Sequence, residues 1–578
     1  MTISHSARFT ELLHGRLSRL YPEAEVPDIQ RFIEDLLSVF RASMVPAKTS
    51  RWDERDILLI TYGDSLCRGD EQPLAVLCRF LEQRLAGIIS TVHILPFFPY
   101  SSDDGFSVID YRLVNPELGD WAAVERLGKF FDLMFDLVIN HVSSRHQWFQ
   151  NFLNGVEPGA GYFITPPDEA DLAHVVRPRD SALLTPFTTA NGEQHVWTTF
   201  SADQIDVDFR NPAVLAEYIS LLLFYLERGA RFVRLDAIAF LWKEWGTGCL
   251  NLPETHEVVH LLRDILDEVS PKTVLLTETN VPHQQNISYF GDSDEAHMVY
   301  QFSLAPLLLH SLYRGTSHYL TEWARTSALA PPGCTYLNFT ASHDGIGMRP
   351  LEGLLPQGEI ELLLKGMEKF GGRISYRSQA DGGKSAYEIN ITYFDALKGT
   401  WLGTDSWQLA RFFLAQTVML GLRGIPAVYI HSLLATENDQ DAVERGGRAR
   451  LINRHKWDLD VLEELLFQPQ SNQAIVFNEL RRRIKIRSEQ PAFHPDARQR
   501  VLFLGEHLFG FWRHSRDGEQ TILAIHNLTD QPRHLYLDGA LDGTLEGFWS
   551  DLLTGGRVNT SGGRIKLPPY HVYWLVRE

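Results

Sequence analysis

Eight short apolar runs, most of them followed by a helical pattern, constrain the fold of this chain more than any other feature. They are "DILLITY" (56–62), "STVHILPFF" (90–98), "FFDLMFDLVINH" (130–141), "ARFVRLDAIAF" (230–240), "KTVLLTETN" (272–280), "AHMVYQFS" (296–303), "CTYLNFTASHD" (334–344) and "IPAVYIHSLL" (425–434). Strands that alternate with amphipathic helices form a parallel sheet. Eight such units close into a (β/α)8 TIM barrel, so we predict an α/β protein of this architecture.

The connections between the predicted strands differ in length, and two of them are too long to be simple loops. Residues 142–210 follow the third strand and predict an inserted domain. Residues 345–408 follow the seventh strand and predict a long, glycine-rich insertion beside the active site. The barrel itself would then comprise residues 51–141 and 211–490, preceded by a helical N-terminal extension (1–50) and followed by a C-terminal β domain (491–578).

Charge and cysteine usage exclude several classes of protein. The formal net charge is −19, which argues against a nucleic-acid binder or a protein of anionic membrane surfaces. The four cysteines are scattered without a CxxC pair, as is typical of reduced thiols, and the first residues contain no apolar leader. We therefore expect a cytoplasmic enzyme without a cofactor, acting on a small molecule. Assembly into a homo-oligomer is compatible with the sequence.

One predicted strand, "RFVRLDAIAF", has two charged residues in an otherwise apolar run. Side chains alternate along a strand, so Arg234 and Asp236 share one face and lie within reach of each other. A structural ion pair is one interpretation, because a buried charge is costly unless it is paired. The other is that Arg234 keeps Asp236 ionised as a nucleophile at the end of a strand.

Further carboxylates stand at the ends of other predicted strands. Asp136 and His141 end the third, Glu278 ends the fifth, and His343 with Asp344 ends the seventh. The active site of a TIM barrel lies at these ends. We therefore expect three acidic residues to lie close together at the carboxyl-terminal end of the barrel, namely Asp236, Glu278 and Asp344.

Four segments, "DLVINH", "GARFVRLDA", "LLTETN" and "NFTASHD", resemble in order and spacing the four motif regions of the α-amylase family of glycoside hydrolases. The resemblance implies that Asp236 is the nucleophile, Glu278 the general acid/base and Asp344 the carboxylate that holds sugar hydroxyls. It also implies that three further residues line the sugar subsite, namely His141, Arg234 and His343. A retaining mechanism needs two carboxyl groups with separated pKa values, which this set can supply.

The chain is most similar to the sucrose-phosphorylase branch of that family. "SSDDGFSVIDY" resembles the stretch that contacts glucose, which implies Asp103 and Phe106, and "VWTTFSADQIDVD" implies Phe200 and Gln204 on the acceptor side. "RPRDS" and "SAYEIN" resemble phosphate-binding positions, which implies Arg179 and Tyr387. "INRHKW" implies an acceptor-side arginine, Arg454.

Within that branch, the N-terminal extension and "PYSSDDGFSVIDY" resemble the glucosylglycerate phosphorylases. The resemblance implies cleavage of 2-O-α-glucosylglycerate by phosphate to α-glucose 1-phosphate and glycerate. Ser385 stands where sucrose-type members have an acid, which disfavours fructose as the acceptor. A cation would hold the glycerate carboxylate, and Arg377, Lys384 and Arg454 are the candidates.

Other functions stay open at this point. A phosphorylase acting on sucrose, sucrose 6′-phosphate or glucosylglycerol, or an α-glucosidase or transglucosidase, would share the catalytic residues. A non-enzymatic sugar-binding barrel would usually have lost a carboxylate. "HEVVH" (256–260) matches a zinc-peptidase motif, but no third ligand follows, and we interpret it as part of an amphipathic helix without a metal. "GGRAR" (446–450) is interpreted as a solvated loop.

Overall fold

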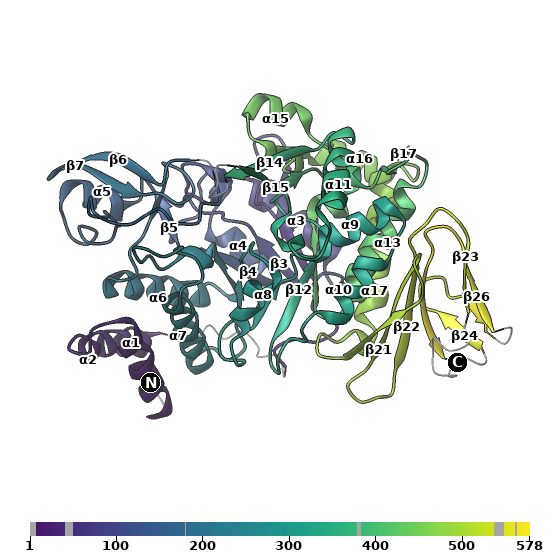
Figure 1. The fold of residues 1–578 in the computed structure, drawn as a ribbon, viewed down its shortest axis with the longest axis horizontal. Coiled ribbons are helices and arrows are strands. Elements are labelled where there is room, and N and C mark those ends of the chain that lie inside the picture. The colour runs from purple at the N-terminus through teal and green to yellow at the C-terminus, as the bar shows by residue number, and fades with distance from the viewer. Residues whose placement is uncertain are drawn as a thin grey trace.

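The computed structural model describes residues 7–40, 50–179, 181–378, 383–536, 548–560 and 563–577. Its centre is a closed barrel of eight parallel strands (Figure 1). In order around the barrel they are β1 (Leu58–Thr61), β3 (Thr91–Ile94), β4 (Asp132–Val138), β9 (Ala230–Asp236), β10 (Val274–Thr277), β11 (Met298–Tyr300), β12 (Thr335–Phe339) and β18 (Ile425–Tyr429). Each of the eight apolar runs supplies one strand, so the predicted TIM barrel is confirmed.

Helices surround the barrel because its strands are buried on both faces and need an apolar cover. Long barrel helices such as α3 (Pro73–Leu85), α6 (Pro212–Glu227) and α7 (Pro253–Val269) bury apolar side chains, and these three begin with a proline in the first turn. Asn211, for example, caps the helix that Pro212 begins by accepting a hydrogen bond from the Ala213 backbone N–H. The other barrel helices are α4 (Trp121–Leu127), α8 (His283–Ile287), α9 (Leu304–Arg314), α10 (His318–Thr326), α13 (Gln408–Gly421), α14 (Ile430–Leu433), α15 (Gln440–Gly446), α16 (Leu459–Phe467) and α17 (Asn472–Ser488).

Short elements line the loops of the barrel. They are the 3-10 turns η1 (Asp103–Gly105), η2 (Ile238–Phe240), η3 (Ser288–Phe290), η5 (Ala449–Asn453) and η6 (Pro491–Phe493), and the parallel pair β2 (Leu66–Cys67) and β19 (Trp457–Asp458). Among the described residues, none of the helices has the length and apolarity that crossing a bilayer requires.

The insertion after the third barrel strand comprises β5 (His141–Ser143), α5 (Gln147–Asn154), β6 (Leu184–Thr189), β7 (Gly192–Trp197) and β8 (Gln204–Asp206). β6 and β7 form an antiparallel hairpin, and β5 pairs with β8 so that His141 lies opposite Asp206. This pairing brings the segment that contains Phe200 and Gln204 back to the end of β4.

The insertion after the seventh strand comprises β13 (Ile346–Gly347), η4 (Arg349–Leu351), α11 (Gln357–Lys369), β14 (Arg373–Ser378), β15 (Lys384–Asn390), α12 (Tyr393–Ala396), β16 (Gly399–Thr400) and β17 (Gly403–Thr404). β13, β15 and β14 form a small antiparallel sheet above the barrel (Figure 1). Residues 379–382 of the predicted glycine-rich loop lie outside the described residues. β15 carries Tyr387 and Glu388 to the barrel mouth.

The two ends of the chain add the remaining elements. In the N-terminal region, α1 (Ala7–Leu20) packs on α7 and α2 (Val26–Val39) on α6. The predicted C-terminal β domain is confirmed: it consists of a six-stranded sheet and a two-stranded one, at the opposite end of the molecule from the β6–β7 hairpin (Figure 1). Its strands are β20 (Arg498–Phe503), β21 (Leu508–His514), β22 (Thr521–Asn527), β23 (Arg533–Tyr536), β24 (Phe548–Asp551), β25 (Arg557–Asn559), β26 (Arg564–Leu567) and β27 (Val572–Arg577). The residue limits of the domains stay predictions.

Candidate active site

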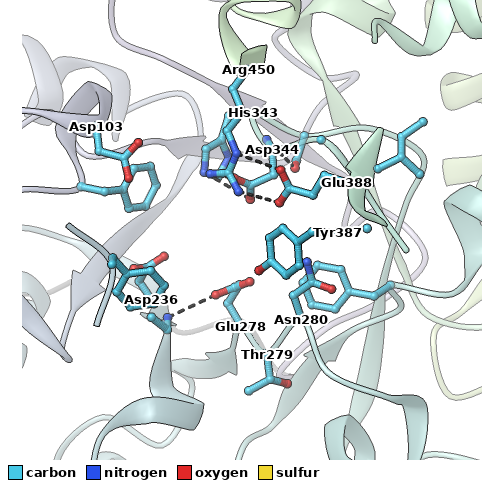
Figure 2. Close-up of a pocket in the computed structure, with 18 of the residues that line it drawn as sticks. Asp103, Asp236, Glu278, Thr279, Asn280, His343, Asp344, Tyr387, Glu388 and Arg450 are labelled. Carbon is cyan, nitrogen blue, oxygen red and sulfur yellow. Dashed lines mark hydrogen bonds and ion pairs between the residues drawn. The ribbon is translucent and has the colours of Figure 1, made fainter. Parts of the chain in front are cut away.

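The three predicted catalytic carboxylates face one cavity at the carboxyl ends of the barrel strands (Figure 2). Asp236 is the last residue of β9, Glu278 directly follows β10, and Asp344 follows β12. The cavity encloses about 1060 Å³, including space that is open to solvent. Every site residue predicted from the sequence lines it except Arg454: Asp103, Phe106, His141, Arg179, Phe200, Gln204, Arg234, Asp236, Glu278, His343, Asp344 and Tyr387.

Arg234 lies between two carboxylates at the floor of this cavity. Its Nη1 donates a hydrogen bond to Asp236 Oδ1 at 2.7 Å and another to Asp136. His93 Nε2 lies 2.6 Å from the other Asp136 oxygen. Burial raises the pKa of Asp236 above its usual value, and Arg234 opposes that rise. Arg234 thus lowers the pKa of Asp236, as expected from the sequence, but burial and the negative charge of Asp136 together outweigh it.

Glu278 has the properties of a carboxylic acid that stays protonated near neutral pH. Burial raises its pKa to about 7, and the carboxylates of Asp236 and Asp344 add to the rise while Arg234 opposes it. The Ala237 backbone N–H donates to Glu278 Oε2 at 3.2 Å. Ala237 has a φ of 53°, which costs a non-glycine residue on the order of 1 kcal/mol. This turn directly after Asp236 directs its N–H toward Glu278.

Asp344 is held by an arginine that the sequence analysis assigned to a solvated loop. Arg450, in η5, lies with its Nη1 2.7 Å from Asp344 Oδ1 and its Nη2 2.5 Å from Glu388 Oε1 (Figure 2). Burial raises the pKa of Asp344, but Arg450 and neighbouring cations outweigh burial and hold that pKa below its usual range. The loop assignment of "GGRAR" was wrong at Arg450, because its partners come from β15 and from the end of β12 and are distant in sequence.

The residues implied for the glucose subsite form one wall of the cavity. The His343 ring stacks on Phe106, with centroids 4.9 Å apart and planes at 4°. His141 Nε2 lies 2.9 Å from the Phe106 carbonyl and 3.1 Å from Gln204 Nε2. Gln204 Nε2 also donates to Asp103 Oδ2 at 3.3 Å. These contacts fix an aromatic surface with polar groups beside it, a common arrangement for binding a sugar ring.

The two residues implied for phosphate, Arg179 and Tyr387, line the main cavity and also a second cavity that adjoins it. Tyr387 is on β15 and faces Glu278 (Figure 2). The Nη2 of Arg179 donates to Asp103 Oδ2 at 3.1 Å, and its guanidinium lies 5.7 Å from the Phe200 ring centroid. About a third of the Arg179 side chain is exposed. Its position therefore allows contact with a ligand that enters beside Glu278.

Arg454, the implied acceptor-side arginine, does not line the main cavity. It lines a second cavity of about 730 Å³, which shares with the first one Asp103, Arg179, Tyr387, Glu388 and Arg450. Its Nε donates to the His343 carbonyl at 2.9 Å, and its Nη1 pairs with Asp104. The other two candidates for a carboxylate partner, Arg377 and Lys384, line neither cavity.

A buried lysine joins three segments beneath the site. Lys243 Nζ lies 2.7 Å from Asp206 Oδ2 at the end of β8, and it donates to Asn140 Oδ1 at 2.7 Å and to the Phe240 carbonyl at 2.6 Å. Both members of the ion pair are almost fully buried. Sequence reasoning missed this residue, because "LWKEW" has no feature that separates it from a surface loop.

The "HEVVH" segment has ordinary structural contacts. His256 Nδ1 lies 2.8 Å from Glu295 Oε2, and Glu257 pairs with Arg19 at 2.6 Å. Within the described part of the chain, no group of three or more His, Cys, Asp or Glu side chains is arranged to hold a metal ion.

Comparison with known proteins gives a family. The model of the α-amylase catalytic domain matches residues 86–324. Glucosylglycerate phosphorylase from Spirochaeta thermophila is 45% identical over 90% of each chain, and glucosylglycerate phosphorylase from Escherichia coli is 41% identical over 95% of this chain and 96% of its own. The crystal structure of sucrose 6F-phosphate phosphorylase from Thermoanaerobacter thermosaccharolyticum is 25% identical, with a TM-score of 0.72 over 91% of this chain and 100% of that one. The chain therefore belongs to the α-amylase family of glycoside hydrolases, in the branch of glycoside phosphorylases.

Proposed function

We propose that this chain is a retaining phosphorylase that converts 2-O-α-glucosylglycerate and phosphate into α-glucose 1-phosphate and glycerate in the cytoplasm. The observation that carries the proposal is that Arg179 and Tyr387, the residues implied for phosphate, line the cavity that also contains Asp236 and Glu278. Arg234 contacts Asp236, and burial raises the pKa of Glu278 to about 7. The substrate follows from the relatives at 41–45% identity, which are glucosylglycerate phosphorylases.

In the first step, Asp236 attacks the anomeric carbon of the glucosyl unit. The bond between that carbon and the glycerate oxygen breaks, and Glu278 donates its proton to the departing oxygen. Asp344, held by Arg450, accepts hydrogen bonds from sugar hydroxyls, while the stacked rings of Phe106 and His343 contact the sugar. The products of this step are glycerate and a covalent β-glucosyl ester of Asp236.

In the second step, a phosphate oxygen attacks the same carbon and releases Asp236. Glu278, now a carboxylate, takes the proton from the phosphate. Arg179 and Tyr387 are proposed to bind the phosphate, and both line the cavity that contains Glu278. A cationic group that faces this position favours phosphate over water as the nucleophile.

The test uses α-glucose 1-phosphate as the donor with D-glycerate, glycerol, fructose, fructose 6-phosphate or no acceptor. Phosphate release that depends on D-glycerate supports the proposal. Release that depends on another acceptor would replace the substrate, but the phosphorylase would stand. Release without any acceptor, together with hydrolysis of simple α-glucosides, would favour an α-glucosidase.

A further inference from the structure

The second cavity has a positive balance of charge in a strongly acidic protein. Four arginines, Arg179, Arg448, Arg450 and Arg454, line it against three carboxylates, Asp103, Asp104 and Glu388. The whole chain has a formal net charge of −19. Arg450 also pairs with Asp344, which lines only the first cavity, so each of the four arginines has a carboxylate partner and a ligand anion binds here by taking over one of them.

The Asp104 carboxylate forms ion pairs with two of these arginines, Arg448 and Arg454. Arg448 Nη2 lies 2.6 Å from Asp104 Oδ1, and Arg454 Nη1 pairs with the other oxygen. Burial raises the pKa of Asp104, but Arg454 and Arg448 outweigh burial and hold that pKa below its usual value. The Asp104 carboxylate thus sits where the carboxylate of a ligand would find both guanidinium groups.

The backbone separates the roles of the two neighbouring aspartates. Asp103 has a φ of 53° and Asp104 a φ of 50°, a conformation that non-glycine residues rarely adopt. As a result, the Asp103 carboxylate meets Arg179 and the Asp104 carboxylate meets Arg448 and Arg454. Asp103 lines both of these cavities, whereas Asp104 lines only the second of the two.

Arg448 and Arg454 differ in how exposed their side chains are and in whether all their donor groups have a partner. Arg454 is nearly buried and fixed by its bond to the His343 carbonyl, yet its Nη2 is buried without a hydrogen-bond partner in the described part of the chain. Arg448 is 46% exposed, so its guanidinium can turn toward an incoming ligand. Together they offer one fixed and one adjustable donor.

We propose that Asp104 is a built-in counter-ion that sets the charge preference of the acceptor subsite, with Arg448 as the cation that it shares with the ligand. A small acceptor with one carboxylate, or phosphate, replaces Asp104 on Arg448, whereas an uncharged acceptor finds both arginines already neutralised. This inference rests on the proposed function for the identity of the acceptor. It concerns two residues, Asp104 and Arg448, to which the sequence motifs assigned no role.

The experiment measures the dissociation constants of D-glycerate, inorganic phosphate and glycerol by calorimetry. Wild type is compared with Asp104→Asn, Arg448→Gln and the control Arg373→Gln. Arg373 is an exposed residue of neighbouring β14, where it donates a hydrogen bond to Gln440 and lines neither cavity. Asp104→Asn should tighten binding of both anions about threefold and Arg448→Gln should weaken it about five- to tenfold, with glycerol and the control unchanged. Equal melting temperatures would show that the variants fold.

Weaker anion binding in Asp104→Asn would overturn the inference, because Asp104 would then be holding the arginines in place rather than competing with the ligand. Parallel changes for glycerol and the anions would also overturn it. Failure of the proposed function looks different: wild type would release no phosphate when D-glycerate is added to α-glucose 1-phosphate. In that case the titrations with inorganic phosphate still test the role of Asp104 as a counter-ion. Unchanged phosphate binding in both Asp104→Asn and Arg448→Gln would refute that role.

Discussion

Replacing Glu278 with glutamine should stabilise the protein at alkaline pH while it removes activity. Glutamine keeps the shape of the side chain and an oxygen for the Ala237 N–H, but it cannot ionise. A rise of the Glu278 pKa from 4.5 to about 7 corresponds to about 3 kcal/mol in favour of the protonated form in the folded state. Ionisation of this buried carboxyl group therefore destabilises folded wild type at alkaline pH, whereas the variant has no group to ionise at this position.

The raised pKa of Glu278 determines how the stability of wild type depends on pH. The pKa of Glu278 is higher in the folded state than in the unfolded state. Protonated Glu278 therefore contributes fully to the free energy of unfolding below pH 4.5, and this contribution is lost as the pH rises through about 7. The melting temperature of Glu278→Gln minus that of wild type should therefore increase between pH 5 and pH 8.5. Over this pH range the difference in free energy of unfolding between the variant and wild type should grow by about 2–3 kcal/mol. For a protein of this size, that corresponds to a few degrees in melting temperature.

Thermal melting at both pH values, followed by circular dichroism, measures this difference. Glu244→Gln, which removes an exposed carboxylate, is the matched control and should give the same difference at both pH values. Turnover of 2-O-α-glucosylglycerate by Glu278→Gln should fall by at least a factor of about 100. An equal difference in melting temperature at pH 5 and pH 8.5 would refute the raised pKa, and with it the account of Glu278 as a protonated acid.

Four further predictions concern other groups of the site. Phosphorolysis by wild type should decline as the pH rises above about 7, because the acid form of Glu278 is lost, and a pH–rate profile flat to pH 9 would contradict this. Asp236→Asn should lower kcat by several orders of magnitude at an unchanged melting temperature, measured by phosphate-dependent release of glycerate, and near-normal turnover would exclude it as the nucleophile. Lys243→Met should leave the Asp206 carboxylate buried without its cation, held only by hydrogen bonds from Asn140 and Thr199, so that unfolding costs about 3 kcal/mol less, and an unchanged melting temperature would show that the pair is dispensable. Arg179→Gln should raise KM for phosphate at least about tenfold with a smaller change in KM for the glucoside, and equal changes in both constants would argue against a phosphate contact.

The barrel could be predicted from sequence because its signal is local. Each parallel strand is buried on both faces, so it is a short apolar run that ends at a polar residue. The position of Asp236 followed in the same way, since the alternation of side chains along β9 places it beside Arg234. Family motifs then gave twelve of the residues that line the cavity, while Arg454, which they also gave, lines the second cavity instead.

The ionic partners of these residues could not be predicted, because they depend on elements far apart in the chain. Arg450 reaches Asp344 only after η5 packs against the insertion that contains Glu388. Asp136 was placed at the end of the third strand, but it lies within β4 and its carboxylate contacts Arg234 and His93. The position of Lys243 likewise depends on the return of β8 to the end of β4.

The most direct test of the central claim is the identity of the sugar product when 2-O-α-glucosylglycerate is cleaved in the presence of phosphate. Proton NMR recorded during the reaction distinguishes the two anomers of glucose 1-phosphate from free glucose. Two displacements at the anomeric carbon, first by Asp236 and then by phosphate, predict α-glucose 1-phosphate as the first product. β-Glucose 1-phosphate would indicate a single displacement, and free glucose would indicate attack by water; either result would contradict the proposed mechanism.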